Sequence, residues 1–593
     1  MNTTSKTKPE KKVNHSFAAG ALIMTLGMFI VKLAGAAFKI PLSYILGGVG
    51  FGYFTTAYNM YSPIHALATA GLPIAISRMV SGYMTQGRYK DVKLMHKISI
   101  PLFMATGLFG SLLMIFGSFY YVRLVNAPGS LYSLLALAPT IFFSCLISIY
   151  KGYYEGLRNM IPTAVSEIIE AFGKVIFGIS LSWLTVSYGM SEFQKFGTVF
   201  GTAYETKEAA KLAILPWVSA AAVVGITLGS VAGYLYMLIK FKISGDGITP
   251  EELKEAPKPY PVKKIMRMLL SISIPVALGA IIMNVASAID STLIQTRLND
   301  IMTSTPEALL KVYGSLIPEQ NIKAGKVHIF LLGCFGYMNT VAMVLPTITQ
   351  GFAISALPNV TSAWVSGVKE KIKSSIETVL KVTSIVSLPI GIGMSVLSFP
   401  IMDLIYNTFG KNKSAEEVVI SSHIMSIYAL GIIFVAIGTP ICSTLQAVGR
   451  ADIPLKALTA GVVMKIALNY ILVGIPEINI QGAGIGTLVC YLFVCAVTLF
   501  SLKKETKVSL DFKGVFLKPL LCALICGATA WASQGLIALV IPYKLATVIA
   551  IVLAAATYIF ALFLTKTVTS KDLATIPKCK KITKVLEKFG MMS

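Results

Sequence analysis

Charged residues are scarce in this chain of 593 residues. Asp, Glu, Lys and Arg make up 13% of it, about half of their share in a typical soluble domain. Apolar residues make up 55% and gather in many windows of about 18 or more residues, long enough to cross the hydrocarbon core of a bilayer. This composition excludes a soluble globular protein and predicts an all-α membrane protein.

The sequence also lacks the motifs of nucleotide and metal chemistry. Gly47-Gly48-Val49-Gly50 is not followed by the Lys-Ser/Thr of a phosphate-binding loop, and no strand precedes the glycines of residues 482–486. Cys522 and Cys526 have no partner set with the spacing of a zinc site. We therefore expect a protein that is not an enzyme and has no cofactor or metal. Its driving force is then the membrane potential, coupling to a monovalent cation gradient, or removal of the transported substrate.

The apolar windows predict fourteen transmembrane helices, arranged as six, six and two. The predicted spans are residues 17–46, 51–84, 94–121, 131–154, 161–188, 212–240, 265–297, 328–365, 375–406, 419–446, 453–474, 480–502, 515–537 and 543–565.

These spans imply two six-helix lobes, followed by two further helices. The predicted organisation is a cytoplasmic basic tail (1–16), an N-lobe (17–240), a cytoplasmic linker (241–264), a C-lobe (265–502), a cytoplasmic loop (503–514), two last spans (515–565) and a second basic tail (566–593). The longest external insert, Asn299 to Lys326, carries a predicted short helix at Pro306 to Tyr313.

The positive charges indicate the orientation. Lys and Arg number 51 against 27 Asp and Glu, and they collect in alternate loops, as expected of cytoplasmic segments. The richest clusters are Lys6 to Lys12, Arg88 to Lys97 and Lys240 to Arg267. We therefore predict a multi-pass protein of the plasma membrane with both termini cytoplasmic, and no nucleic-acid partner.

Several short motifs occur in both halves of the chain in the same order. Those of the first half are Gly52-Tyr53, Leu72-Pro73, Ser77 and Val80-Ser81-Gly82, and those of the second half are Gly336-Tyr337, Leu357-Pro358, Ser362 and Val365-Ser366-Gly367. Further on, Arg158 with Pro162 matches Arg450 with Pro454. Such repeats are typical of secondary transporters, whose substrate site lies between the two halves. Pro73 and Pro358 are predicted to break the second and eighth spans and to act as gates.

Ionisable side chains within the spans are the candidate site residues, because each is costly in lipid and normally faces a cavity or a partner. Lys32 and Lys39 are seven residues apart, so they share one helix face, with Gly35 between them. Arg78 follows the predicted break at Pro73. The alternative is that the lysines reach the membrane surface and that Arg78 is an ordinary arginine at a cytoplasmic helix end.

Four more ionisable residues are candidates for a coupling or charge-partner role. Asp290, in the seventh span, could pair with a cavity lysine or bind a coupling ion. Glu167, Glu170 and Lys174 lie at i, i+3 and i+7 of the fifth span, where Glu170 and Lys174 are spaced to pair. That pattern favours an internally neutralised helix face over a site.

Four segments carry a resemblance to a known family. They are Phe29-Ile30-Val31-Lys32-Leu33, Phe38-Lys39-Ile40-Pro41-Leu42, Gly50-Phe51-Gly52-Tyr53 and Ala70-Gly71-Leu72-Pro73-Ile74-Ala75-Ile76-Ser77-Arg78. The chain resembles the polysaccharide-biosynthesis branch of the multidrug/oligosaccharidyl-lipid/polysaccharide exporter (MOP) superfamily, close to the MurJ-type lipid II flippases and to stage V sporulation protein B.

The resemblance implies two lobes around a central cationic cavity, alternating access, and a groove for the lipid tail beside the last two helices. The family's cavity cations of the first two helices carry over to Lys32, Lys39 and Arg78, with lysine at the first two positions where relatives have arginine. The family's cations near the eighth helix have no match, since that span offers only Asn339 and Gln350.

The expected function is secondary transport of an undecaprenyl-diphosphate-linked precursor, lipid II first, from the inner to the outer leaflet. The expected partners are that lipid, the bilayer and cell-wall synthesis enzymes, and the expected state is a monomer. Three alternatives stay open: an exporter of another lipid-linked polysaccharide, a cation-coupled multidrug antiporter, and a membrane scaffold without transport. The first two spans contain no Asp or Glu, which argues against the antiporter because organic cations need a counter-charge.

Overall fold

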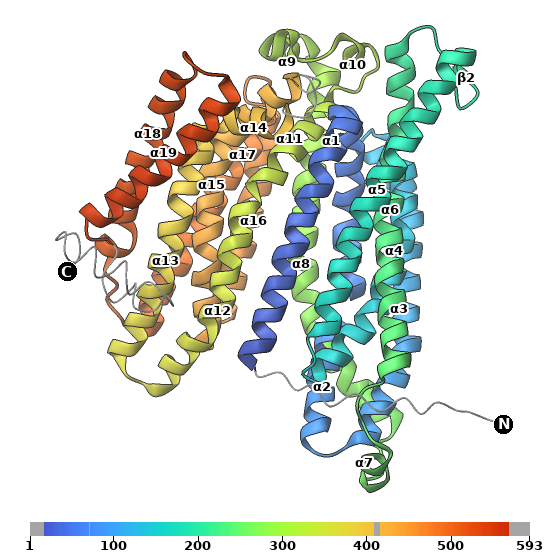
Figure 1. Cartoon of the computed structure of the whole chain (residues 1–593), viewed down its shortest axis with the longest axis vertical. Helices are drawn as coiled ribbons and strands as arrows, with labels where there is room; N and C mark the ends of the chain where they lie inside the picture. Colours follow the sequence, from blue (N-terminus) through green and yellow to red (C-terminus); the bar gives the residue numbers. More distant parts are fainter. Residues whose placement is uncertain (1–16, 70, 408–414, 568–593) are drawn as a thin grey trace. The chain divides into compact units, whose positions relative to one another are not determined.

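The structure, a computed structural model, describes residues 17–69, 71–407 and 415–567 and is almost entirely helical (Figure 1). In the described part, the one sheet is the antiparallel pair β1 (Thr198–Val199) and β2 (Thr202–Ala203). The predicted all-α fold class is therefore confirmed.

Contacts within the chain divide it into two compact units. Among the described residues, unit 1 runs to Asn299 and includes Glu319–Gly333, while unit 2 comprises Asp300–Pro318 and the chain from Cys334 onward. The seventh predicted span, residues 265–297, thus lies entirely in the unit of the first six. The predicted lobes, residues 17–240 and 265–502, divide the chain according to its sequence repeats. This division stays a prediction.

Unit 1 contains the helices of the first half of the chain, drawn in blue to green in Figure 1. They are α1 (Phe17–Thr69), α2 (Gly71–Thr85), α3 (Tyr89–Leu124), η1 (Pro128–Ser130), α4 (Leu131–Gly156), α5 (Ile161–Phe196), α6 (Lys207–Ser244), α7 (Pro250–Glu255), most of α8 (Val262–Ser304), α10 (Glu319–Lys323) and the start of α11 (Val327–Ala342).

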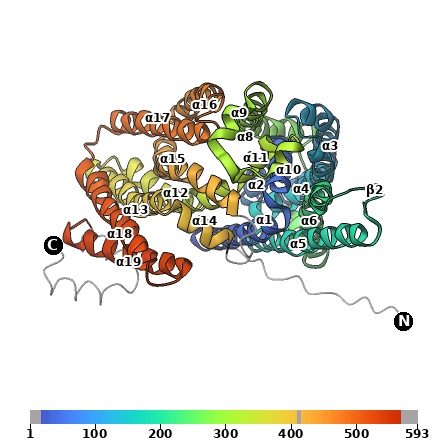
Figure 2. The ribbon, with the colours of Figure 1, turned by 90° about the horizontal axis from the view of Figure 1, so that it is seen from above.

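Unit 2 contains the remaining elements, in which α18 and α19 lie side by side (Figures 1 and 2). They are α9 (Pro306–Tyr313), η2 (Gly314–Leu316), the rest of α11, α12 (Val344–Ser366), α13 (Lys369–Val396), α14 (Ser398–Tyr406), α15 (Ala415–Ala447), α16 (Asp452–Val473), α17 (Gln481–Thr506), η3 (Lys513–Leu517), α18 (Lys518–Ile537) and α19 (Tyr543–Leu564).

Eleven of the described helical segments are long and apolar enough to cross a membrane. One of them, Leu26–Thr85, covers two predicted spans. The charged helices α5 and α8 coincide with two more. Together these account for the fourteen predicted spans of a multi-pass membrane protein.

The first two spans meet at Gly47. Its backbone has φ 57° and ψ −175°, in the left-handed range of φ that favours glycine, and interrupts α1 there. The rings of Phe38 and Phe54, on opposite sides of Gly47, are 6.1 Å apart. The two parts of α1 therefore fold back on each other.

The helix break predicted at Pro73 stays a prediction, and the one predicted at Pro358 is wrong. Pro358 lies inside α12, and the eighth span is interrupted at Met343, between α11 and α12. Pro346 explains this position, because proline fits the first turn of a helix but has no N–H to donate to a carbonyl of the preceding turn.

One helix crossing in unit 1 brings backbone against backbone at two points. A Cβ atom on Gly52 of α1 would overlap the carbonyl oxygen of Ile329 on α11, and one on Gly333 of α11 would overlap that of Gly48. Glycine is therefore required here to let α1 and α11 approach.

The external insert and hairpin are held by side-chain hydrogen bonds. The predicted helix at Pro306–Tyr313 is confirmed as α9, and the Tyr313 hydroxyl donates to Asn479 Oδ1. After α5, the Gly201 N–H donates to Glu192 Oε1 across 3.0 Å and lowers the pKa of that carboxyl below its usual value.

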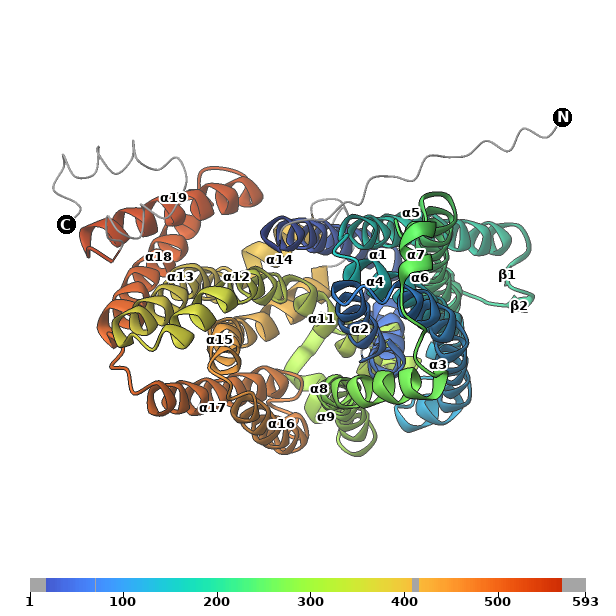
Figure 3. The same ribbon diagram turned by 90° about the horizontal axis from the view of Figure 1, so that it is seen from below.

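The predicted linker is tied to unit 1 at the end that carries α2 and α7 (Figure 3). The Tyr260 N–H donates to Asp91 across 2.7 Å, and the Arg88 guanidinium lies 3.6 Å from the centre of the Tyr260 ring. Asp246 accepts from Tyr153 and pairs with Lys93 at 2.5 Å. Residues 245–261 are therefore held against the helices of unit 1 by specific contacts and are not a free connector.

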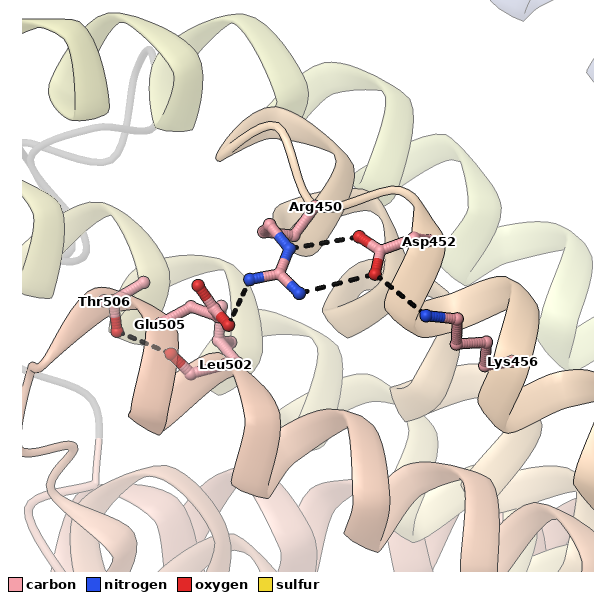
Figure 4. Close-up of polar contacts among 6 residues, drawn as sticks. All are labelled: Arg450, Asp452, Lys456, Leu502, Glu505 and Thr506. Carbon is pink, nitrogen blue, oxygen red and sulfur yellow. Dashed lines mark hydrogen bonds and ion pairs between the residues drawn. The ribbon is translucent and has the colours of Figure 1, made fainter.

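The repeated Arg450 has a structural role in unit 2 (Figure 4). Its guanidinium donates to Asp452 at 3.0 and 3.3 Å and to Glu505 at 2.5 Å. These bonds join the turn before α16 to the end of α17.

The orientation is tested by labelling single cysteines in a cysteine-free background. Gln86 and Ser509 are exposed ends of loops that should be cytoplasmic, and Ser304 is exposed at the end of α8. We expect Ser304→Cys to react with an impermeant thiol reagent in intact cells, and Gln86→Cys and Ser509→Cys to react only after permeabilisation. Asn412, also predicted to be external, lies outside the described residues. External labelling at Gln86 would reverse the predicted topology.

Candidate functional site

Lys32 and Lys39 lie on one face of the first part of α1, as predicted. Lys32 is exposed and Lys39 is half-buried. A Cβ atom on Gly35, between them, would meet no atom within 4 Å. The space beside Gly35, between the two lysines, is therefore open.

Lys174 of α5 joins the two lysines of α1. Its charge and that of Lys32 both act on the ammonium group of Lys39, and the charge of Lys32 acts on Lys174. Close packing explains the approach, because Phe38 fills the space that a Cβ on Gly178 of α5 would occupy. We call Lys32, Lys39 and Lys174 the lysine cluster.

An aromatic row borders the lysine cluster. The Lys39 Nζ lies 5.8 Å from the ring centre of Tyr58, on the second part of α1. Tyr58 is followed by Tyr61 at 5.5 Å, and Tyr61 by His65 at 5.1 Å between ring centres. Aromatic faces attract cations without removing their charge, so Tyr58 can hold Lys39 in place while the lysine stays available to an anion.

The glutamates of α5 pair with a lysine that sequence reasoning missed. Lys151 Nζ of α4 lies 3.1 Å from Glu170 Oε1 and 3.4 Å from Glu167 Oε1. These ion pairs run from α5 to α4, and the predicted pairing of Glu170 with Lys174 along α5 stays a prediction. The one available signal was a single lysine near the end of the fourth span, preceding two acidic residues on the fifth.

The structure does not bring Arg78 into the lysine cluster. Arg78 is exposed on α2, and it takes part in none of the ion pairs found among the described residues. Its predicted role in binding stays a prediction.

Asp290 is buried on α8, with 7% of its surface exposed. Its predicted pairing with a cavity lysine, or with a coupling ion, stays a prediction. Within the part of the chain that the structure describes, no group of three or more His, Cys, Asp and Glu side chains is placed to hold a metal ion.

The arrangement can bind an anion inside a membrane. Three ammonium groups on two adjacent helices repel one another, and an anion with two or more negative charges relieves that repulsion. Lysine offers a point charge with rotatable donors in place of the planar fork of arginine, so the cluster selects charge more than shape.

Two family models match separate parts of the chain. The model described as lipid II flippase MurJ matches residues 337–576, and the model described as polysaccharide biosynthesis protein matches residues 17–204. The two matches lie in different halves and cover both the lysine cluster and the last two helices.

Two relatives of this chain come from Bacillus subtilis (strain 168). Lipid II flippase MurJ is 23% identical over 482 residues, which is 80% of each chain. Stage V sporulation protein B is 19% identical over 513 residues, 86% of this chain and 88% of the relative. Among solved structures, lipid II flippase MurJ in an inward closed conformation matches with a TM-score of 0.61 and 17% identity, covering 91% of this chain and 98% of that one.

Proposed function

Because the chain is related to the MurJ and polysaccharide-biosynthesis proteins and has the MurJ fold, we propose that it is a flippase for a lipid-linked precursor. It is a transporter rather than an enzyme. Its cargo is an undecaprenyl-diphosphate-linked cell-wall precursor, lipid II first, which it moves from the inner to the outer leaflet by alternating access.

The observation that carries this proposal is the lysine cluster. Lys32, Lys39 and Lys174 act on one another through their charges, and the space beside Gly35 is open. A diphosphate headgroup matches this site because it bears about two negative charges and strong acceptor oxygens, so charge-assisted hydrogen bonds offset its loss of water.

The driving force follows from the charge of the cargo. Moving about two negative charges out of a negative interior releases roughly 4 to 5 kcal/mol per 100 mV, if the protein's own charges stay in place. No nucleotide or cofactor is then needed, although a monovalent cation could be coupled to the same step. We propose that the protein acts as a monomer in the lipid bilayer, alongside cell-wall synthesis enzymes.

The cargo is tested with purified protein in proteoliposomes. We expect lipid II to reach the opposite leaflet at least tenfold faster than in protein-free vesicles, because the site compensates the diphosphate charge. An undecaprenyl diphosphate carrying a different glycan, assayed in parallel, separates lipid II transport from transport of any lipid-linked saccharide. Transport of tetraphenylphosphonium without flipping of either lipid would support the multidrug antiporter and contradict the proposal.

A further inference from the structure

Glu170 lies between two groups of positive charge. Its carboxylate is 3.1 Å from Lys151 Nζ on α4, and its charge also acts on Lys174, which follows it by one turn on α5. Lys174 belongs to the lysine cluster. The same carboxylate thus pairs with Lys151 and acts through its charge on one member of the lysine cluster.

The stem of Glu170 is fixed by α6. A Cβ atom on Gly233 would lie 2.5 Å from Glu170 Cγ, and one on Gly173 would lie 2.8 Å from Gly229 Cα. Glycines at these positions let α5 and α6 pack closely and leave a fitted space for the glutamate stem. The carboxylate carbon lies 3.2 Å from the same Cβ position at Gly233, and Oε1 of that carboxylate pairs with Lys151.

Lys151 does not depend on Glu170 alone. Glu167 Oε1 lies 3.4 Å from the same ammonium group, so Lys151 keeps a counter-charge if Glu170 turns away. This matters because an unpaired charge in the membrane interior is strongly unfavourable. Glu170 can therefore pair with either Lys151 or Lys174 at low cost in free energy. Glu167 stays paired with Lys151.

We propose that Glu170 is the resident counter-ion of the lysine cluster, and that a bound diphosphate competes with it for Lys174. This inference rests on the proposed function and adds a residue to it. In the empty site Glu170 compensates part of the cluster's charge. When the diphosphate binds, Glu170 is left to Lys151, and its return to Lys174 favours release of the cargo.

The proposal predicts that removing the Glu170 charge tightens binding and slows transport. The probe is undecaprenyl diphosphate, titrated against full-length protein in phosphatidylcholine nanodiscs. We expect Glu170→Gln to lower the Kd about three- to tenfold and to reduce flipping in proteoliposomes, because the competitor that helps release is gone. The matched control is Glu167→Gln, which removes the same charge from the Lys151 pair but lies two turns from Lys174; its Kd should stay within twofold of wild type.

A double variant tests the route through Lys174. In a Lys174→Gln background, Glu170→Gln should no longer tighten binding, because the shared partner is absent. If Glu170→Gln is poorly folded by size-exclusion chromatography, Glu170→Asp replaces it, since the shorter side chain withdraws the carboxylate and should lower the Kd at least twofold.

Several outcomes would contradict the counter-ion role. They are a Kd that rises or stays unchanged in the Glu170 variant, an equal decrease in Glu167→Gln, or a decrease that persists without Lys174. Lys32→Ala in the same titration reports on the proposed site itself, so unchanged affinity there would contradict the proposed function separately. Wild-type protein that fails to bind the probe would contradict both.

Discussion

Replacing Lys32 with alanine is expected to abolish complementation of a flippase-deficient strain at normal membrane abundance. A charge-assisted hydrogen bond to an anion contributes about 1.5 to 3 kcal/mol, and its loss lowers transport on the order of 10- to 100-fold. Lys39→Ala should have a similar effect, since the two lysines share one face of α1. Arg78→Ala tests the prediction that its exposed guanidinium on α2 also binds the cargo.

The control variants separate charge from shape. Lys32→Arg should retain function, because the cluster compensates charge without requiring a particular donor geometry. Lys32→Glu should be more harmful than Lys32→Ala, since it adds repulsion to the lost attraction. A membrane scaffold would tolerate all of these variants, and a drug antiporter would keep or increase efflux of organic cations. Complementation by Lys32→Glu at wild-type abundance would refute an anionic cargo.

A crosslink between α8 and the external end of α3 is expected to stop transport. Asn126 Nδ2 donates to Asn299 Oδ1 across 2.9 Å, and both residues lie at ends that are predicted to be external. If the two repeats move apart to open the outer side, this contact must separate. In Asn126→Cys/Asn299→Cys, a short bis-methanethiosulfonate reagent added from outside should reduce flipping at least tenfold, and a thiol reductant should restore it because both links to the reagent are disulfides.

The control for this crosslink lies in the hairpin after α5. Thr198 and Ala203 face each other in the β1–β2 pair, so Thr198→Cys/Ala203→Cys joins residues of one repeat only. The same reagent should leave transport in this variant unchanged. If flipping is undiminished after the cysteines at positions 126 and 299 are completely crosslinked, α8 moves together with the rest of unit 1. The two sequence repeats are then not the bodies that move during transport.

Elements with strong local signals could be predicted from the sequence. Apolar length defines the spans, and Pro306 at the first position of a helix, with Gly314 after its end, marks α9 within one residue. The shared face of Lys32 and Lys39 follows from helix period alone. These predictions depend on neighbours in the chain, which the sequence contains.

Features that depend on contacts between helices could not be predicted in this way. A single lysine near the end of the fourth span does not show that Lys151 faces Glu167 and Glu170 on the fifth, because helix rotation is set by packing. For the same reason Lys174 joins Lys32 and Lys39, although its i,i+4 spacing from Glu170 suggests a local pair. The eighth span breaks at Met343, before Pro346, and not at Pro358. The sequence repeat alone does not show which of these two prolines interrupts the helix.

The bare backbone contact of α1 with α11 has a mechanical consequence. Gly333 meets only backbone atoms of Gly48 and Gly52, and Gly52 meets the carbonyl group and one methyl group of Ile329, so little side-chain material lies between the two helices. What is lost on parting is dispersion and weak Cα–H···O attraction, and both return when the surfaces meet again. Such a contact between helix backbones offers little resistance to sliding. It closes in one register, because only there do the two backbone surfaces match, and a single added methyl group at the contact would hold the helices apart.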